Sequence, residues 1–233
     1  MFNDSGKRSL VVRLVLALLL AVCGFETSFA QSEHPITGRR IAPVMGVGGA
    51  PWLDRSEREM EEAPDKALDA IDLRPGMIVA DVGAGTGYFS LRMARRVGPS
   101  GKVYANDIQP EMLEKLRASA QREKLANIET VLGSEADPKL PLSKIDMVLL
   151  VDVYHEFSQP QEMLQHIRAA LKPDGRLILL EYRKEDPAVP IRPEHKMSVP
   201  EVKAEVEAEG YKLDKVIETL PRQHIIIFRK LSM

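Results

Sequence analysis

The chain has 233 residues, with 32 Lys and Arg against 34 Asp and Glu, and its single cysteine is Cys23. This near-neutral balance and an aromatic content of 5% provide neither the basic surface nor the stacking platforms that nucleic acid requires, so no nucleic-acid partner is predicted. The lone cysteine excludes an intrachain disulfide and a thiolate metal cluster.

The N-terminus shows the pattern of a secretory signal peptide, which we predict over residues 1–30. Three basic residues precede an apolar stretch over residues 14–25, and Ser28 and Ala30 are small residues suited to a cleavage site. The apolar stretch is too short to cross ~30 Å of hydrocarbon as a stable helix. We therefore expect an exported, periplasmic protein that is cleaved near Ala30 and has no stable transmembrane span.

Two other fates of the N-terminus stay open. "LAVC", which ends at Cys23, resembles a lipoprotein box, although Val22 stands where that pattern prefers a smaller residue. Translation from Met45 would give a cytoplasmic form. Cleavage after Ala30 removes three basic and two acidic residues, leaving 29 basic and 32 acidic residues and a net charge of −3.

Residues 31–63 are predicted to be irregular and to form an N-terminal extension or lid, with Trp52 either anchoring it over a site or simply packing. From Pro64 onward, helical and strand patterns alternate. Helices are predicted at the start of this region and over residues 86–97, 110–124, 160–171 and 199–209. Ser158 is the expected N-cap of the third of these four. Strands are predicted over residues 77–82, 102–108, 128–133, 145–152, 175–182, 211–218 and 224–230.

Strands that are apolar along their length and separated by helices indicate a parallel sheet covered on both faces. Residues 64–233 are therefore predicted to form one α/β domain with a doubly wound, mostly parallel, seven-stranded sheet. The last two strands lack an intervening helix and should form an antiparallel pair at the C-terminal edge. In such sheets ligands bind at the carboxyl ends of the strands.

The segment "VADVGAGTGYFS" places Gly83, Gly85 and Gly87 between the first strand and the next helix. Glycine allows the backbone to approach a ligand closely. The spacing G-x-G-x-G is one residue tighter than the dinucleotide fingerprint G-x-G-x-x-G. Asp107 ends the second strand, where a carboxylate either accepts hydrogen bonds from a ribose diol or caps the next helix. We favour the ribose.

Four segments together resemble the successive motifs of class I S-adenosylmethionine-dependent methyltransferases of the small-molecule type. They are "VADVGAGTGYFSLRMA", "KVYANDIQPEML", "IDMVLLVDVYHEF" and "LKPDGRLILLEY", and the resemblance runs from about Pro64 to Phe228. It implies a Rossmann-like methyltransferase fold, S-adenosyl-L-methionine as cofactor, and methyl transfer to a small-molecule acceptor.

The resemblance also implies which residues hold the cofactor. The glycine loop would wrap the methionine part of the cofactor. Asp107 would bind the ribose hydroxyls, and the loop after the third strand would bind the adenine. Glu135 is preferred there over Asp137, which is also suited to a turn before Pro138. The predicted cofactor-binding residues are Asp81, Gly83, Gly85, Thr86, Gly87, Tyr88, Asp107, Ile108, Glu135, Asp137 and Asp152. Tyr88 would either lie over the cofactor or pack at the edge of the core.

The predicted catalytic residues are His155, Glu156 and His195. "DVYHEF" ends the fourth strand, and His155 is a candidate base with Glu156 orienting it or binding substrate, or else only shapes the pocket. His195 lies in "VPIRPEHKMS", a loop from which it could reach an acceptor. With Glu194 these residues are the types that could ligate a metal ion, but no ligand spacing supports a metal site and none is predicted. His34 and His224 are expected to be structural.

The main alternative is an exported noncatalytic domain that retains the fold and binds a nucleoside-type ligand, because S-adenosylmethionine is made in the cytoplasm. An NAD-dependent oxidoreductase is disfavoured by the glycine spacing. The chain also lacks the Asn/Asp-Pro-Pro-aromatic motif typical of methyltransferases that modify nucleic-acid bases or glutamine.

Overall fold

The computed structural model describes residues 33–231. The predicted signal peptide and its alternative anchor at Cys23 therefore lie outside the described residues. Within the described part, every helix is too short or too polar to span a lipid bilayer.

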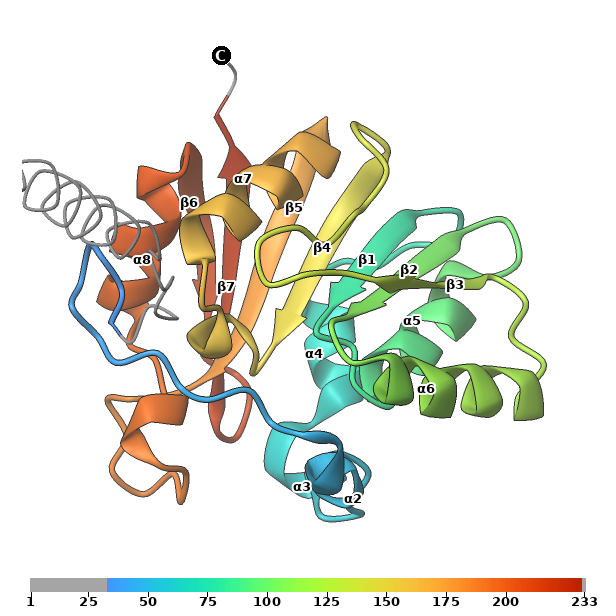
Figure 1. The fold of residues 1–233 in the computed structure, drawn as a ribbon, viewed down its shortest axis with the longest axis horizontal. Helices are drawn as coiled ribbons and strands as arrows, with labels where there is room; N and C mark the ends of the chain where they lie inside the picture. The colour runs from blue at the N-terminus through green and yellow to red at the C-terminus, as the bar shows by residue number, and fades with distance from the viewer. Residues whose placement is uncertain (1–32, 232–233) are drawn as a thin grey trace, which may run out of the picture. The chain divides into compact units, whose positions relative to one another are not determined.

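The seven strands form one sheet in the order β3-β2-β1-β4-β5-β7-β6. The strands are β1 (Ile78–Val82), β2 (Lys102–Asp107), β3 (Ile128–Leu132), β4 (Ile145–Val151), β5 (Leu171–Tyr182), β6 (Tyr211–Ile217) and β7 (Gln223–Lys230). Strands β1 to β5 pair in parallel, and β7 runs antiparallel to both of its neighbours (Figure 1). The mostly parallel, seven-stranded sheet with a C-terminal antiparallel pair is thus confirmed. Within that pair β6 is outermost, and β7 lies between β5 and β6.

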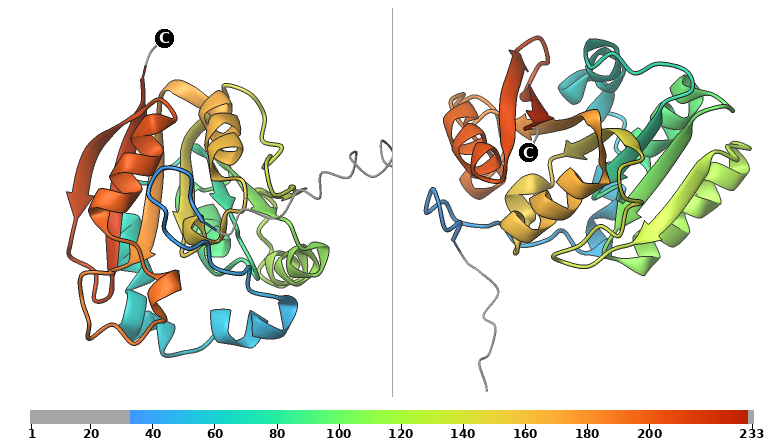
Figure 2. Two further views of the ribbon diagram at one scale, coloured as in Figure 1. Left: turned by 60° about the vertical axis from the view of Figure 1, so that its left-hand side comes forward. Right: turned by 90° about the horizontal axis from the view of Figure 1, so that it is seen from above.

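Helices cover both faces of the sheet (Figure 2). Alternate residues of β4 show the division, because successive side chains of a strand point to opposite faces. Met147 and Leu149 pack in one core cluster with α4 (Pro64–Ala70) and α5 (Tyr88–Val97), while Val148 and Leu150 pack in another with α7 (Pro160–Ala170) and α8 (Val199–Ala208). Leu116 of α6 (Pro110–Arg122) packs against Ala105 of β2. This arrangement leaves the strand ends free to form a site.

Prolines and one serine cap mark the starts of three helices, and one predicted cap is wrong. Proline occupies the first turn of α6, α7 and α8, where its missing N–H has no intrahelical partner to lose. Ser198 caps α8 in a reciprocal capping box with Glu201. The expected N-cap role of Ser158 is wrong, because Gln159 occupies the cap position. Ser158 Oγ instead donates a hydrogen bond of 3.0 Å to Glu135 Oε2.

The N-terminal extension is more ordered than the sequence indicates, with η1 (Val47–Gly49), α2 (Ala50–Leu53) and α3 (Arg58–Glu62). Its first part is held to α8 by a 2.9 Å contact between Arg39 Nε and Glu205 Oε1, and Thr86 Oγ1 in the glycine loop donates to Asp54 Oδ1 at 2.7 Å. The extension crosses the carboxyl-end side of the sheet from α8 to the glycine loop (Figure 1, blue to cyan). It is therefore in place to wall a site there.

Candidate functional site

A cleft lies at the carboxyl ends of β1, β2 and β4, walled by the N-terminal extension. It encloses about 900 Å³ of empty space, including the part open to solvent. The predicted cofactor-binding residues that line it are Gly83, Gly85, Asp107, Ile108, Glu135 and Asp152. Part of the predicted cofactor-binding set therefore lies in this cleft.

The glycine loop needs glycine for both conformation and space. Gly83, Gly85 and Gly87 have φ angles of 76°, 54° and 93°, in the left-handed region that side chains disfavour. A Cβ atom on Gly83 would lie 2.4 Å from Cγ2 of Val153. The N–H groups of Gly83 and Ala84 both donate to the carbonyl of Asn106, at 2.9 and 2.8 Å. The loop is thus folded tightly against the end of β2.

Asp107 ends β2 at the wall of the cleft. Its Oδ2 accepts from the N–H of Gly85 and its Oδ1 from the N–H of Gln109, each at 2.9 Å. Burial raises the pKa of this carboxyl, and the backbone donors of Gln109 and Gly85 oppose that rise. Each oxygen keeps a second lone pair, so the carboxylate retains capacity to accept hydrogen bonds from a diol.

Asp81 lies in a smaller neighbouring cavity rather than in the cleft itself. Thr86 and Tyr88 line this cavity with it, and both cavities share Arg58. Asp81 Oδ2 accepts from Ser90 Oγ at 2.6 Å, and burial raises the pKa of Asp81 to about 6. Asp81 therefore ties β1 to α5 behind the glycine loop.

In the loop after β3, only one of the two residues predicted to bind adenine reaches the cleft. Glu135 lines the cleft. Asp137 lines neither cavity, and its Oδ1 accepts from the backbone N–H of Lys139 at 2.7 Å in an exposed turn. Gly87 likewise lines neither cavity; a Cβ atom there would lie 2.7 Å from Cγ of Leu116.

Asp152 lines the cleft and has one carboxylate oxygen without a hydrogen-bond partner among the described residues. Its φ angle of 49° follows the end of β4, and its Oδ2 accepts from Gln223 Nε2 at 2.7 Å. The unpaired oxygen is Oδ1, which is buried. Burial, together with the charges of Glu62 and Glu181, raises its pKa well above the ordinary value. A cationic ligand group would complete this site.

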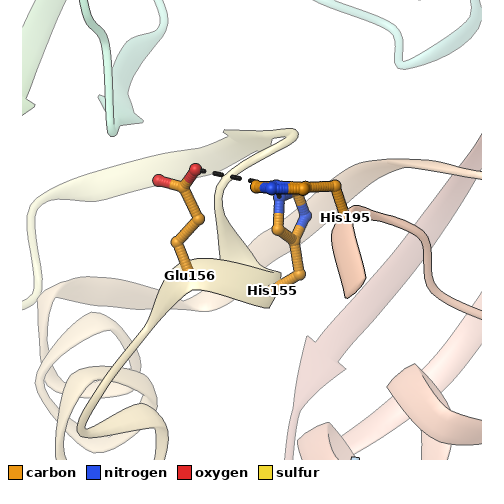
Figure 3. A group of neighbouring side chains, drawn as sticks. All are labelled: His155, Glu156 and His195. Carbon is orange, nitrogen blue, oxygen red and sulfur yellow. Dashed lines mark hydrogen bonds and ion pairs between the residues drawn. The ribbon is translucent and has the colours of Figure 1, made fainter. Parts of the chain in front are cut away.

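The three predicted catalytic residues meet in one cluster (Figure 3). His155 Nε2 lies 3.1 Å from His195 Nδ1, which lies 4.0 Å from Glu156 Oε1. His155 and Glu156 belong to η2 (Tyr154–Glu156) and His195 to η3 (Pro193–His195). Of the three, only Glu156 lines the cleft.

His155 is oriented by Glu181, so of the two roles considered for Glu156 the substrate-binding one remains. Glu181, rather than Glu156, holds this imidazole, with 2.6 Å between Glu181 Oε2 and His155 Nδ1. Both ring nitrogens of His155 are thus occupied, and the residue is 2% exposed. Burial raises the pKa of Glu156 to about 7, and burial with the nearby His155 lowers that of His195. Glu156 is consequently better placed than His155 to exchange a proton with a ligand.

Two site residues were missed from the sequence. Arg58 lines both cavities. Its Nε lies 2.6 Å from Glu62 Oε2, and its Nη1 donates to the carbonyl of Leu53 at 2.9 Å. It was hidden in a charged run that resembles a solvated helix face. Glu181 stands inside the apolar run "LILLEY", where an acidic residue is costly without a partner. An acidic residue within an apolar strand was therefore the sequence feature that could have identified Glu181.

The described residues fit S-adenosylmethionine, the cofactor that the resemblance implies. Gly83 and Gly85 line the cleft with backbone alone, and a Cβ atom on Gly83 would collide with Val153. Asp107 has acceptor capacity that suits ribose hydroxyls, and an ammonium group would suit the unpaired Asp152 Oδ1. The donors and acceptors of the cleft therefore match the polar groups of this cofactor.

Comparisons with known proteins agree with this arrangement. Residues 73–221 match the sequence model of a family described as "Methyltransferase domain". A 112-residue region, 48% of this chain, is 34% identical to 40% of the nocamycin O-methyltransferase of Saccharothrix syringae. A 124-residue region, 50% of this chain, is 34% identical to 44% of the ubiquinone/menaquinone biosynthesis C-methyltransferase UbiE of Pasteurella multocida. The matches thus span less than half the length of these two relatives.

A solved structure extends the likeness over most of the domain. A SAM-dependent methyltransferase from Aquifex aeolicus is 28% identical, with a TM-score of 0.75, over 79% of this chain and 98% of that one. The strand order, the glycine loop at the carboxyl ends of the strands and the family match over residues 73–221 all agree. The chain belongs to the class I S-adenosylmethionine-dependent methyltransferase family, whose cofactor is S-adenosylmethionine.

Proposed function

We propose that this protein transfers a methyl group from S-adenosylmethionine to a small-molecule acceptor bound in the cleft. The observation that carries the proposal is that the glycine loop, Asp107 and Glu156 open onto the same cleft. Cofactor and acceptor groups would thus meet at the end of β4. The relatives named above act on oxygen and on carbon, so they support methyl transfer without fixing the accepting atom.

The chain's own residues would align the reactants. When bound, S-adenosylmethionine supplies a methyl group on a sulfonium centre that is already activated for displacement. Backbone around Gly83 and Gly85 would hold the methionine part, Asp107 the ribose and Glu135 the adenine side of the cleft. Alignment and the exclusion of water account for much of the rate enhancement in reactions of this kind.

Glu156 is the proposed proton acceptor for an acceptor that carries an ionisable hydrogen. It lines the cleft, and burial brings the pKa of its carboxyl to about 7, near the range that suits a general base. Its Oε2 is 3.4 Å from the backbone N of Met45 in the extension. Oε1 faces His195 at 4.0 Å, so a proton taken up by Glu156 has a neighbouring imidazole beside it.

The N-terminal extension supports a small acceptor. Val44, Met45, Trp52 and Leu53 wall the cleft from outside the sheet. Gln109 Nε2 donates to the carbonyl of Met45 at 2.9 Å and fixes this wall to the start of α6. A covered cleft of this kind admits small molecules more readily than a folded macromolecule.

Two measurements test the proposal. Calorimetric titration with S-adenosylmethionine and S-adenosylhomocysteine measures cofactor binding, and labelled methyl transfer to small-molecule extracts measures the reaction. Binding together with a labelled small product is the expected result. Binding of the cofactor without transfer to any extract would favour the noncatalytic alternative, and failure to bind either nucleoside would reject the function.

We also propose that the protein is exported, on the signal-peptide pattern of residues 1–30. N-terminal sequencing of the protein from its own cell tests this. Gln31 at the N-terminus is the expected result. A lipidated Cys23 would indicate a membrane anchor, whereas Met1 or Met45 would indicate retention in the cytoplasm and contradict export.

A further inference from the structure

We infer that His155, His195 and Glu156 form a binding site for a divalent transition-metal ion at the wall of the cleft. One atom from each residue, His155 Nε2, His195 Nδ1 and a carboxylate oxygen of Glu156, lies within 4.8 Å of the others (Figure 3). Sequence spacing gave no reason to expect this, because His195 joins the pair from a distant loop. Glu194, the fourth sequence candidate, is not part of the group.

The distances suit coordination by a single ion. Metal–nitrogen and metal–oxygen bonds of about 2.1 Å allow two ligand atoms to be at most about 4.2 Å apart. The separation of 3.1 Å between the two imidazole nitrogens and that of 4.0 Å between His195 Nδ1 and Glu156 Oε1 both meet this limit. A small rotation of the Glu156 side chain would bring the remaining pair within reach.

Glu181 supplies the support that metal-binding histidines usually have. Ligating imidazoles typically donate their other N–H to a carboxylate, which fixes the ring and its tautomer. Glu181 Oε2 lies 2.6 Å from His155 Nδ1, so the Nε2 lone pair of His155 is directed toward His195. Glu181 itself is fully buried and also accepts from the N–H of Tyr154 at 3.0 Å.

The local charge favours a cation. Among the described residues, the ion-pair contacts of Glu181 and Glu156 are with histidine alone, and neither contacts a lysine or arginine. Two mostly buried carboxylates without a full cationic partner are costly. A divalent ion would offset both charges, through Glu156 directly and through Glu181 by way of His155.

The donor set indicates the class of ion. Two imidazole nitrogens and one carboxylate oxygen suit zinc, iron, cobalt or nickel better than calcium or magnesium. Three protein ligands leave coordination positions open, as in catalytic zinc sites. Because Glu156 lines the cleft, these positions would be available to an acceptor oxygen, nitrogen or sulfur. With Glu156 coordinated, the ion would replace it as the group that promotes loss of the acceptor's proton. These last two consequences rest on the proposed function, whereas metal binding itself does not.

The test is titration of the chelator-treated, full-length protein with Zn²⁺ by calorimetry and with Co²⁺ by visible absorption. We expect one ion per chain and a cobalt spectrum typical of mixed nitrogen and oxygen ligands. His195→Ala and Glu156→Gln should weaken binding at least about tenfold, and Glu181→Gln by about 10–100-fold without removing a ligand. His166→Ala is the control, because this exposed histidine on α7 lies outside the cluster.

Two results would overturn the inference. One is that the wild-type protein binds neither ion. The other is that His195→Ala binds Zn²⁺ as tightly as the wild type, which would leave only a hydrogen bond between two histidines. Circular dichroism and titration with S-adenosylhomocysteine identify misfolded variants, because His195 lies outside the predicted cofactor site. Nucleoside binding without Zn²⁺ binding would reject the metal site alone, and the reverse would reject the proposed function alone.

Discussion

Glu181 Oε2 lies 2.6 Å from His155 Nδ1, and this contact joins β5 to the segment that follows β4. The two residues are 26 positions apart in the chain and are both buried. Glu181 Oε1 also accepts from the N–H of Tyr154, so one carboxylate holds two donors of η2. The position of Glu156 at the cleft therefore depends on a side chain that does not itself line the cleft.

Glu181→Ala should lower the free energy of unfolding by about 3 kcal/mol. The substitution leaves the buried N–H of Tyr154 and an imidazole nitrogen of His155 without their partner, and a buried unpaired donor costs about 1–3 kcal/mol. Urea unfolding measures the change. Glu194→Ala serves as the control and should change stability by less than about 0.5 kcal/mol. Equal stabilities of the two variants would contradict the structural role of Glu181.

Gly83→Ala should destabilise the protein by about 3 kcal/mol. The φ angle of 76° strains a residue with a side chain, and the new Cβ would lie 2.4 Å from Val153 Cγ2. Gly48→Ala is a suitable control, because a Cβ atom there meets nothing within 4 Å. A double-mutant cycle with Val153→Ala, followed by thermal or urea unfolding, should show a favourable coupling of about 1–2 kcal/mol. Additive effects would mean that the loop does not pack against Val153.

Arg39→Met should destabilise the N-terminal extension and the domain by about 3–5 kcal/mol. It leaves the buried carboxylate of Glu205 without its arginine, although His34 Nε2 is 3.3 Å away. The double variant Arg39→Met/Glu205→Met should recover much of the loss, because no unpaired charge remains. Chemical unfolding of the three proteins tests this. A single variant as stable as the wild type would show that the extension is not anchored here.

Asp81 should make stability depend on pH. Burial raises the pKa of its carboxyl from 3.8 to about 6, a change equivalent to about 3 kcal/mol. The charge of Arg58 and the hydroxyl of Ser90 oppose the rise, while the charge of Asp107 adds to it. Because the folded protein holds the proton more tightly than the unfolded chain, this stability is present below the ordinary pKa. It is lost as the pH rises through about 6.

Asp81→Asn isolates that contribution, since the amide stays neutral and its oxygen still accepts from Ser90. The unfolding free energy of the variant, minus that of the wild type, should increase by about 2–3 kcal/mol between about pH 4 and about pH 8. Urea titrations at each pH measure both proteins. Parallel pH profiles would show that Asp81 does not change its charge in this range.

Local patterns predicted the elements that depend on local physics. Apolar runs marked all seven strands, and the prolines of α6 and α7 marked their starts. The same patterns placed Asp107 and the glycine loop at neighbouring strand ends, because parallel strands that pair side by side end at a common edge.

Contacts between distant segments could not be predicted from local sequence patterns. Glu181 meets His155, and Arg39 meets Glu205 across 166 positions, through tertiary packing that no local period encodes. The extension was expected to be irregular because its glycines and charges resemble a linker. Its order comes instead from partners on the domain, such as Thr86 for Asp54. Arg58 was missed for the same reason, because it lies in the charged run that resembles a linker.

Titration of the wild type, Asp107→Ala and Asp137→Ala with S-adenosylhomocysteine tests the central claim that the cofactor binds in the glycine-loop cleft. Asp107 lines that cleft, whereas Asp137 lies in an exposed turn outside it. Loss of charged hydrogen bonds to the ribose should weaken binding by about 10–150-fold in Asp107→Ala. Asp137→Ala should bind as the wild type does. A wild type that does not bind, or an Asp107→Ala variant that binds equally tightly, would contradict the account.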